Sequence, residues 1–179
     1  METARLFHFS DDPGITALTP RPVRVAPPRP AGKQWLNGPL VWAIDHAHQF
    51  LYLFPRECPR ILVWAKPDSS AADRAAWLGT DRAAAFIEAD WLERFETGQL
   101  TRYELAPDGF EDLQDAGMWV SRQPASIIGR SILGDLPGEL AGQGVRLSVV
   151  SSLLPLRSLW ETSLHASGIR LRNAQGWPG

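Results

Sequence analysis

Short apolar runs separated by turn-forming residues follow one another along the chain, and they predict a series of short strands. Alternation of apolar and polar residues predicts a strand at 5–10, which ends at a turn signal at 11–14. Similar runs predict strands at 40–44, 60–65, 100–105, 118–121, 127–133 and 145–150. Strands this short, bounded by turns, favour antiparallel pairs over a doubly wound parallel sheet.

Four segments have helical spacing, and helix-start residues precede three of them. Asp45 occupies a capping position before a predicted helix at 46–54, and Pro55 ends that helix. Further helices are predicted at 71–78, 91–97 and 135–141. Two segments stay open, because the alanines of 84–89 suit a strand or a helix and Pro155 interrupts 153–164.

Together these elements predict an α+β fold with one mixed, mainly antiparallel sheet and short helices. The chain has 179 residues, 44% of them hydrophobic, and a chain of this length buries roughly 70% of its unfolded surface. We therefore expect a single domain over residues 1–179 that needs neither a disulfide nor a metal to hold its core.

A proline-rich, basic arm at 19–33 interrupts the pattern of strands and helices. Its prolines remove backbone donors and favour extended geometry, so no regular element is predicted there. The arm carries Arg21, Arg24, Arg29 and Lys33, and no carboxylate occurs between residues 13 and 44. Its charges either attract an anionic ligand or serve solubility alone.

Charge and composition exclude several classes of protein. The formal net charge is −2, divided into +3 over residues 1–67, −8 over 68–115 and +3 over 116–179. This modest basic content, without a basic helix stripe, argues against a protein that binds duplex nucleic acid. No apolar run approaches the roughly 20 residues of a membrane span. The single cysteine, Cys58, and the lack of a leader segment predict a cytoplasmic protein.

Common catalytic and metal motifs are missing from the sequence. It contains no CxxC, HExxH, GxSxG or P-loop pattern, so we expect no metal. On a helix, the side chains of His46 and His48 would diverge by about 200° and could not share a metal. On a strand they would share one face, and this alternative would suit a metal-dependent hydrolase. Cys58 has no histidine partner nearby in sequence and is expected to be unreactive.

On the helix predicted at 46–54, Asp45, His48 and Tyr52 lie on one stripe. A carboxylate beside an imidazole fixes its tautomer and raises its basicity, which indicates half of a binding site. The alternative is a capping aspartate, a solvent-facing histidine and a tyrosine at the edge of the core. Arg56 and Arg60 flank Pro59 and either fork onto a phosphate or carboxylate or pair with neighbouring acidic residues.

Two resemblances extend this interpretation. Four segments, RLFHFSDDPGITALTPRPVRV, GPLVWAIDHAHQFLYLFPRECPRI, MWVSRQP and SGIRLRNA, resemble an uncharacterised bacterial family over most of the chain. More distantly, His8-Phe9-Ser10 is similar to the histidine and Ser/Thr of the first strand in the ADP-ribosyltransferase superfamily. The segment VWAIDHAHQFLYLF is similar to that superfamily's second block, with Trp42 in the strand and Tyr52 in the helix.

The superfamily resemblance implies an NAD-type site. His8 would bind ribose or the carboxamide, and Tyr52 would stack on nicotinamide; both would be the catalytic residues. The superfamily's late-strand glutamate has no counterpart in Met118-Trp119-Val120-Ser121, which leaves catalysis doubtful and nucleotide-phosphate binding the stronger expectation. The expected binding residues are His8, Ser10, Arg24, Trp42, Asp45, His48, Tyr52 and Arg56.

The competing hypothesis is a non-enzymatic interaction or structural protein, for instance a homodimer. Eight tryptophans would mainly fill the core and one interface. Trp35, beside the arm, and Trp177, near the C-terminus, are the expected contact residues.

Overall fold

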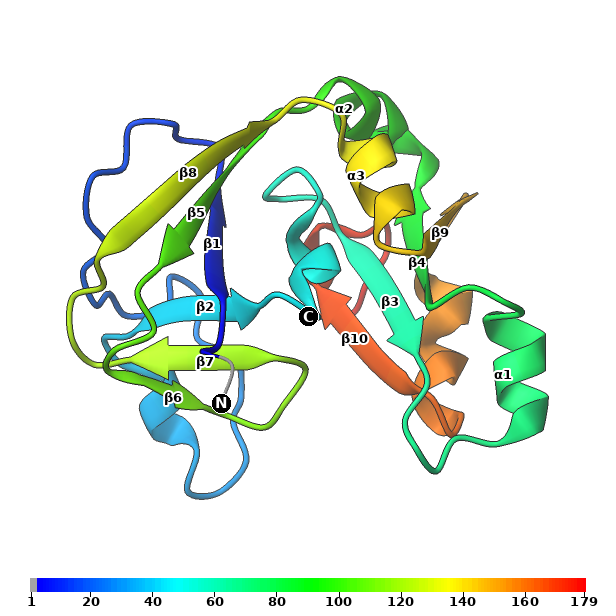
Figure 1. Ribbon diagram of the computed structural model, residues 1–179. Coiled ribbons are helices and arrows are strands. Elements are labelled where there is room, and N and C mark those ends of the chain that lie inside the picture. Colours follow the sequence, from blue (N-terminus) through cyan, green and yellow to red (C-terminus); the bar gives the residue numbers. More distant parts are fainter. Residues whose placement is uncertain (1–2) are drawn as a thin grey trace. The chain divides into compact units, whose positions relative to one another are not determined.

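The computed structural model describes residues 3–179, coloured from blue to red along the chain in Figure 1. The chain divides into two compact units. The first holds the residues up to Gln49 together with Leu100–Ile132, and the second holds Phe50–Gln99 and Leu133–Gly179. The strands form two sheets, so the expectation of one sheet is wrong; apolar runs mark strands but carry no information about their partners. The single domain over 1–179 stays a prediction.

The sheet of six strands follows the order β6-β7-β2-β1-β5-β8. Its strands are β1 (Leu6–Ser10), β2 (Val41–Asp45), β5 (Leu100–Leu105), β6 (Phe110–Asp112), β7 (Met118–Ser121) and β8 (Ile127–Leu133). β1 pairs antiparallel with both β2 and β5, and β7 pairs antiparallel with both β2 and β6 (Figure 1). β1 therefore lies inside the sheet, and its alternate residues face opposite sides.

The core of the first unit gathers on one face of this sheet. Its buried side chains are those of Leu6, Val41, Ala43, Tyr103, Leu105 and Ala125. Tyr103 is fully buried, and its hydroxyl donates to the carbonyl oxygen of Asp12 at 2.6 Å and accepts from the amide of Ile15 at 3.1 Å. The phenol thus anchors the turn after β1 to the core.

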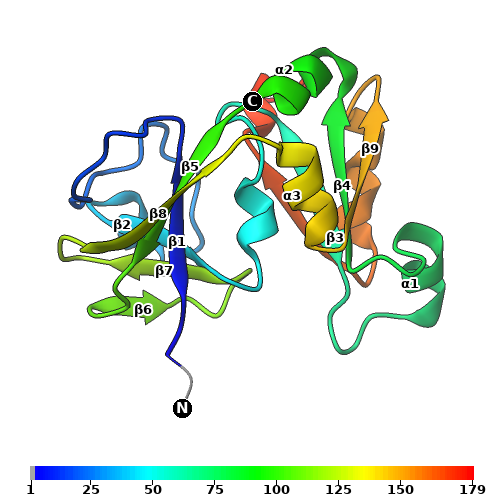
Figure 2. The same cartoon turned by 45° about the horizontal axis from the view of Figure 1, so that its top comes forward.

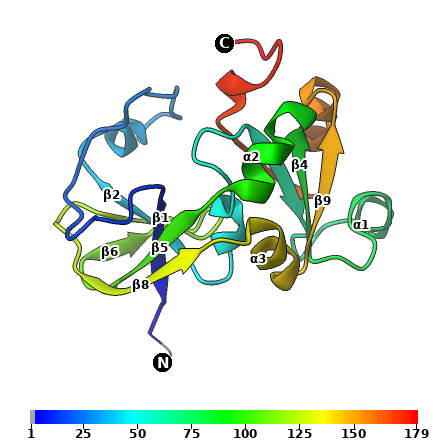
Figure 3. The same cartoon turned by 90° about the horizontal axis from the view of Figure 1, so that it is seen from above.

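The proline-rich arm has no helix or strand over residues 19–33, as predicted (Figure 3). An isolated bridge joins Arg21 to Leu40, and Arg29 Nε donates to Asn37 Oδ1 at 2.9 Å. The arm runs into a short 3-10 helix, η1 (Gln34–Asn37). These contacts hold the arm against its own unit without a ladder of backbone bonds.

The second sheet follows the order β10-β3-β4-β9. Its strands are β3 (Arg60–Trp64), β4 (Ala83–Glu88), β9 (Val145–Val150) and β10 (His165–Ile169). The β4–β9 pair is parallel and the other two pairs are antiparallel, so the chain has an α+β fold with mainly antiparallel sheets. Every residue of β4 is buried, which explains its unbroken apolar run from Ala83 to Ile87.

Short helices complete the second unit. The α-helices are α1 (Ala71–Trp77), α2 (Leu92–Thr97) and α3 (Leu136–Gly142), and the 3-10 helices are η2 (Gln49–Tyr52), η3 (Ala89–Trp91), η4 (Leu154–Glu161) and η5 (Leu171–Asn173). Figure 2 shows α2 and α3 beside β4. Ser70 caps α1 and Asp135 caps α3 through their side-chain oxygens, as expected of these residue types.

The helix predicted at 46–54 is wrong. Only the 3-10 helix η2 forms there, and Phe50, Leu51, Leu53 and Phe54 are each at most 1% exposed. These four side chains belong to the buried core, and a segment this short is marginal as an isolated helix, so packing against the core decides its backbone. The open segment 84–89 forms a strand, and 153–164 contains η4. The pattern missed β6 and β10, which have few apolar residues.

Candidate functional site

The residues expected to form one nucleotide site belong to both units. The first unit holds His8, Ser10, Arg24, Trp42, Asp45 and His48, and the second holds Tyr52 and Arg56. The two sets of residues are therefore described separately, first those of the first unit and then those of the second.

His8 lies on β1 opposite Tyr103 of β5. Its Nδ1 atom is 3.1 Å from the carbonyl oxygen of Trp42. Because a carbonyl only accepts hydrogen bonds, Nδ1 carries the hydrogen in this contact. The described backbone pairing between β1 and β2 ends at Phe7. Beyond this point, the imidazole of His8 and not a backbone amide donates to the Trp42 carbonyl.

Ser10 and Arg24 differ in their exposure. Ser10 is 3% exposed, and its hydroxyl accepts from the backbone amide of Asp12 at 3.1 Å. This bond shapes the turn after β1 and gives Ser10 a structural role. Arg24 is exposed within the arm.

Trp42 faces the side of the sheet opposite to His8. Its neighbours Val41 and Ala43 belong to the core face, so the indole points away from that face and packs beside Leu36, Leu40 and Val120. The indole Nε1 is buried and has no hydrogen-bond partner among the described residues. Arg29 lies 5.6 Å from the ring centroid. The sheet thus separates Trp42 from His8 and Ser10, and the buried N–H needs an acceptor.

Asp45 and His48 form a close pair at the end of β2. His48 Nδ1 lies 2.9 Å and 3.1 Å from the two carboxylate oxygens, and the backbone amide of His48 donates to Oδ1 at 2.7 Å. Burial raises the pKa of Asp45, but the hydrogen bonds and charge of His48 outweigh it and the net pKa is lowered. The ionised carboxylate accepts, so Nδ1 carries the hydrogen and Nε2 is the basic atom of neutral His48.

Gly117 packs directly on this pair. A Cβ atom at position 117 would lie 2.4 Å from His48 Nδ1 and 2.6 Å from Asp45 Oδ1, and the backbone has a φ of +72°. The carbonyl of Gly117 also accepts from the Asp45 amide at 2.9 Å. Only glycine fits a left-handed position with this close approach. The sequence pattern did not single out this residue.

A pocket of about 420 Å³ opens beside Asp45 in the first unit. Its lining residues are Thr3, Ala4, Arg5, Asp45, His46, Ala47 and Trp119. Arg5 is fixed there by two hydrogen bonds to Glu104, at 2.8 Å and 3.0 Å. Arg5 and Trp119 were not expected in the site, because they are far from Asp45 in sequence and only the sheet brings them together.

In the second unit, Tyr52 lies against Arg60, whose guanidinium carbon is 5.7 Å from the ring centroid. Burial raises the pKa of the Tyr52 phenol against the opposing charges of Arg60 and Arg170, so the hydroxyl stays protonated at neutral pH. Burial also raises the pKa of Cys58 to about 11, which agrees with an unreactive thiol.

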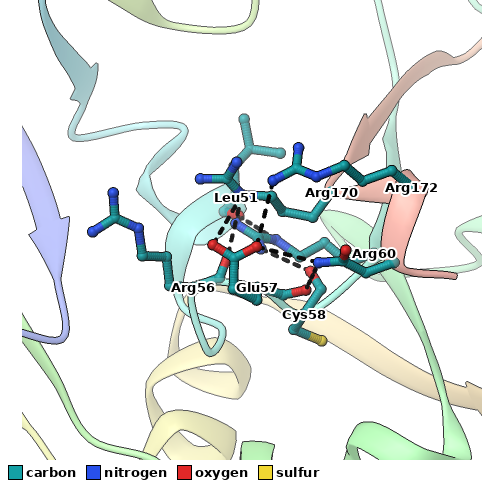
Figure 4. Close-up of polar contacts among 8 residues, drawn as sticks. Leu51, Arg56, Glu57, Cys58, Arg60, Arg170 and Arg172 are labelled. Carbon is teal, nitrogen blue, oxygen red and sulfur yellow. Dashed lines mark hydrogen bonds and ion pairs between the residues drawn. The ribbon is translucent and has the colours of Figure 1, made fainter. Parts of the chain in front are cut away.

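Arg56 takes part in a group of polar residues drawn in Figure 4. Its backbone carbonyl accepts from Arg170 Nε at 3.4 Å, and its guanidinium points away from Glu57 in the figure. The fork of Arg56 and Arg60 on a phosphate or carboxylate, one of the two interpretations of the sequence, stays a prediction.

Residues 3–179 contain no group of three or more His, Cys, Asp or Glu side chains placed to hold a metal ion. In the same residues, no helix has the length and apolar character needed to cross a membrane.

The chain belongs to DUF6886, a family of unknown function that matches residues 7–174. No curated protein and no solved structure matches it.

Proposed function

We propose that the first unit binds a nucleotide, NAD or a related nucleotide phosphate, in the pocket beside Asp45 and His48. The observation that carries this proposal is the Asp45 carboxylate, which is held by His48 at the wall of a pocket of about 420 Å³. Pockets of about 300–1,000 Å³ with a few fixed polar groups are typical of small-molecule sites.

The chemistry of the lining fits the parts of a nucleotide. An ionised carboxylate accepts hydrogen bonds from ribose hydroxyls, and the Trp119 ring offers a face for a base. Arg5 offers donors to a phosphate, at the cost of its bonds to Glu104. In this arrangement His48 orients the Asp45 carboxylate through Nδ1.

The superfamily resemblance implies a different centre. It assigns the ligand contact to His8, whose Nδ1 is bonded to the Trp42 carbonyl, and stacking to Tyr52 of the second unit. Variants of Asp45 and His8 therefore distinguish the two positions.

Thermal shift and calorimetry with NAD, ADP-ribose, nicotinamide and phosphate test the proposal. A ligand at about 100 times its Kd stabilises the fold by about 2.7 kcal/mol. We expect the shift to be lost in Asp45→Asn and retained in Asp108→Asn, an exposed aspartate of the same unit. Loss in His8→Ala instead would place the ligand at His8, and no shift with any ligand would overturn nucleotide binding.

A second candidate function is self-association through β8. Ile128 and Ile132 are 64% and 57% exposed and lie on one face of this edge strand. A homodimer would cover both side chains. Size-exclusion chromatography with light scattering is expected to give a dimer for the native chain and a monomer for Ile128→Lys; a native monomer would contradict this candidate.

A further inference from the structure

The topology of the second sheet brings arginines from two distant segments together. Arg60 opens β3 and Ile169 ends β10, and the two are partners in the antiparallel ladder. The residues that follow Ile169 therefore lie beside the start of β3. Figure 4 shows Arg170 and Arg172 reaching toward Glu57 and Arg60. We call Arg60, Arg170 and Arg172 the arginine cluster.

Glu57 is the carboxylate that faces the arginine cluster. Its oxygens lie 3.9 Å from Arg170 Nε and 3.5 Å from Arg172 Nη2, both longer than the 2.7–2.9 Å of a strong charge-assisted hydrogen bond. Asn173 Nδ2 donates to the carbonyl oxygen of Glu57 at 2.7 Å and to its carboxylate at 3.2 Å. Glu57 is thus held more closely by an amide than by either arginine.

Arg60 lies beneath this surface, and Glu57 acts on it through charge alone, because the described hydrogen bonds of the guanidinium go to backbone carbonyls. It is 2% exposed. Its Nε and Nη2 atoms donate to the carbonyl oxygen of Leu51 at 3.0 Å and 2.9 Å, and Nη1 donates to that of Cys58 at 3.0 Å. Burial lowers the pKa of Arg60 to about 10, so the guanidinium remains charged at neutral pH. The carbonyls fix its orientation but supply no compensating anion.

We propose that the arginine cluster is a phosphate-binding site in which the Glu57 carboxylate competes with the ligand. Three guanidinium groups and one carboxylate carry a formal charge of +2, which matches a phosphate dianion. The side chains of Arg170 and Arg172 are 30% and 43% exposed, so a phosphate reaches their planar donors from solvent. Glu57 occupies the place of the phosphate when no ligand is bound. This inference holds whether or not the first unit binds a nucleotide.

Because Glu57 competes with the ligand, neutralising this carboxylate and neutralising an arginine are expected to change the phosphate affinity in opposite directions. Glu57→Gln removes a repulsive charge and is expected to tighten phosphate binding about threefold or more at low salt. Arg172→Gln removes a donor fork and is expected to weaken it about tenfold. Arg157→Gln, at an exposed arginine of the same unit, is the matched control with the same change in net charge.

Calorimetric titration of the full chain with inorganic phosphate, pyrophosphate and AMP tests these expectations. Binding of all three supports a general phosphate site, and binding of AMP alone assigns the site to nucleotides. Equal affinities in Arg172→Gln and Arg157→Gln would reveal a diffuse charge effect and overturn the proposal, as would weaker binding in Glu57→Gln. Circular dichroism of each variant confirms that the fold is intact, and Arg172→Lys repeats the test if Arg172→Gln does not fold.

Discussion

One charged group of each unit, Asp45 in the first and Arg60 in the second, is held in the opposite way to the other. In the first unit, Asp45 meets a side chain, the imidazole of His48, at 2.9 Å. In the second unit, the buried guanidinium of Arg60 donates its hydrogen bonds to the backbone carbonyls of Leu51 and Cys58. A side-chain pair satisfies charge and hydrogen bonds together, whereas carbonyls satisfy the donors and leave most of the charge uncompensated. The first arrangement suits hydrogen bonding and proton transfer, and the second suits attraction of an anion.

Removal of the carbonyl-bound charge is expected to have the largest effect. Arg60→Ala leaves the carbonyls of Leu51 and Cys58 without donors and opens a cavity, and should lower the free energy of unfolding by about 3 kcal/mol. Urea denaturation measures this loss. Arg157→Ala, at an exposed position, should change stability by less than about 0.5 kcal/mol. A similar small loss for Arg60→Ala would mean that water replaces the guanidinium.

Crowding the side-chain pair is expected to have an intermediate effect. In Gly117→Ala the new methyl group would overlap His48 Nδ1 and force a positive φ on alanine, at a cost of about 2 kcal/mol. Gly134→Ala is the matched control, because nothing lies within 4 Å of its Cβ position and its φ is not in the left-handed region. In a His48→Ala background the cost of Gly117→Ala should shrink. An unchanged cost would assign it to the backbone alone.

Neutralising the carboxylate of the pair is expected to have the smallest effect on stability. Asp45→Asn should cost about 1 kcal/mol at pH 7, since it weakens hydrogen bonds to a charged acceptor. The lowered pKa of Asp45 means that its contribution is fully present above about pH 4 and is lost as pH falls through the folded-state value. The difference between native and Asp45→Asn chains, from urea curves at several pH values, should therefore vanish in acid. A constant difference down to pH 2 would contradict this linkage.

Local sequence patterns predicted two kinds of element correctly. These are strands with one buried face, which show alternation, and helices that begin at a capping residue. The alternation at 5–10 and 100–105 corresponds to β1 and β5, and the caps Ser70 and Asp135 mark the starts of α1 and α3. The same reasoning failed at 46–54, where packing of four apolar side chains into the core, and not the local helical spacing, decides the backbone. Asp45 still bonds the His48 amide, because a cap needs only three residues.

The candidate site was predicted in part for the same reason. Asp45 and His48 are three residues apart, so their pairing follows from sequence, although on a turn instead of a helix. Trp42 and His8 were assigned to one site by resemblance, and sheet register places their side chains on opposite faces. Register is a property of strand pairs, and a one-residue difference reverses the face.

The sequence by itself determined the α+β character, most short elements, the irregular arm at 19–33 and the Asp45–His48 pair, because each depends on neighbours a few residues apart. Tertiary structure alone decided that the strands form two sheets, that Gly117 covers the pair, and that Arg170 and Arg172 meet Glu57 more than 110 residues away in sequence. Those contacts are formed by strand pairing and burial between distant segments, and no local spacing encodes them.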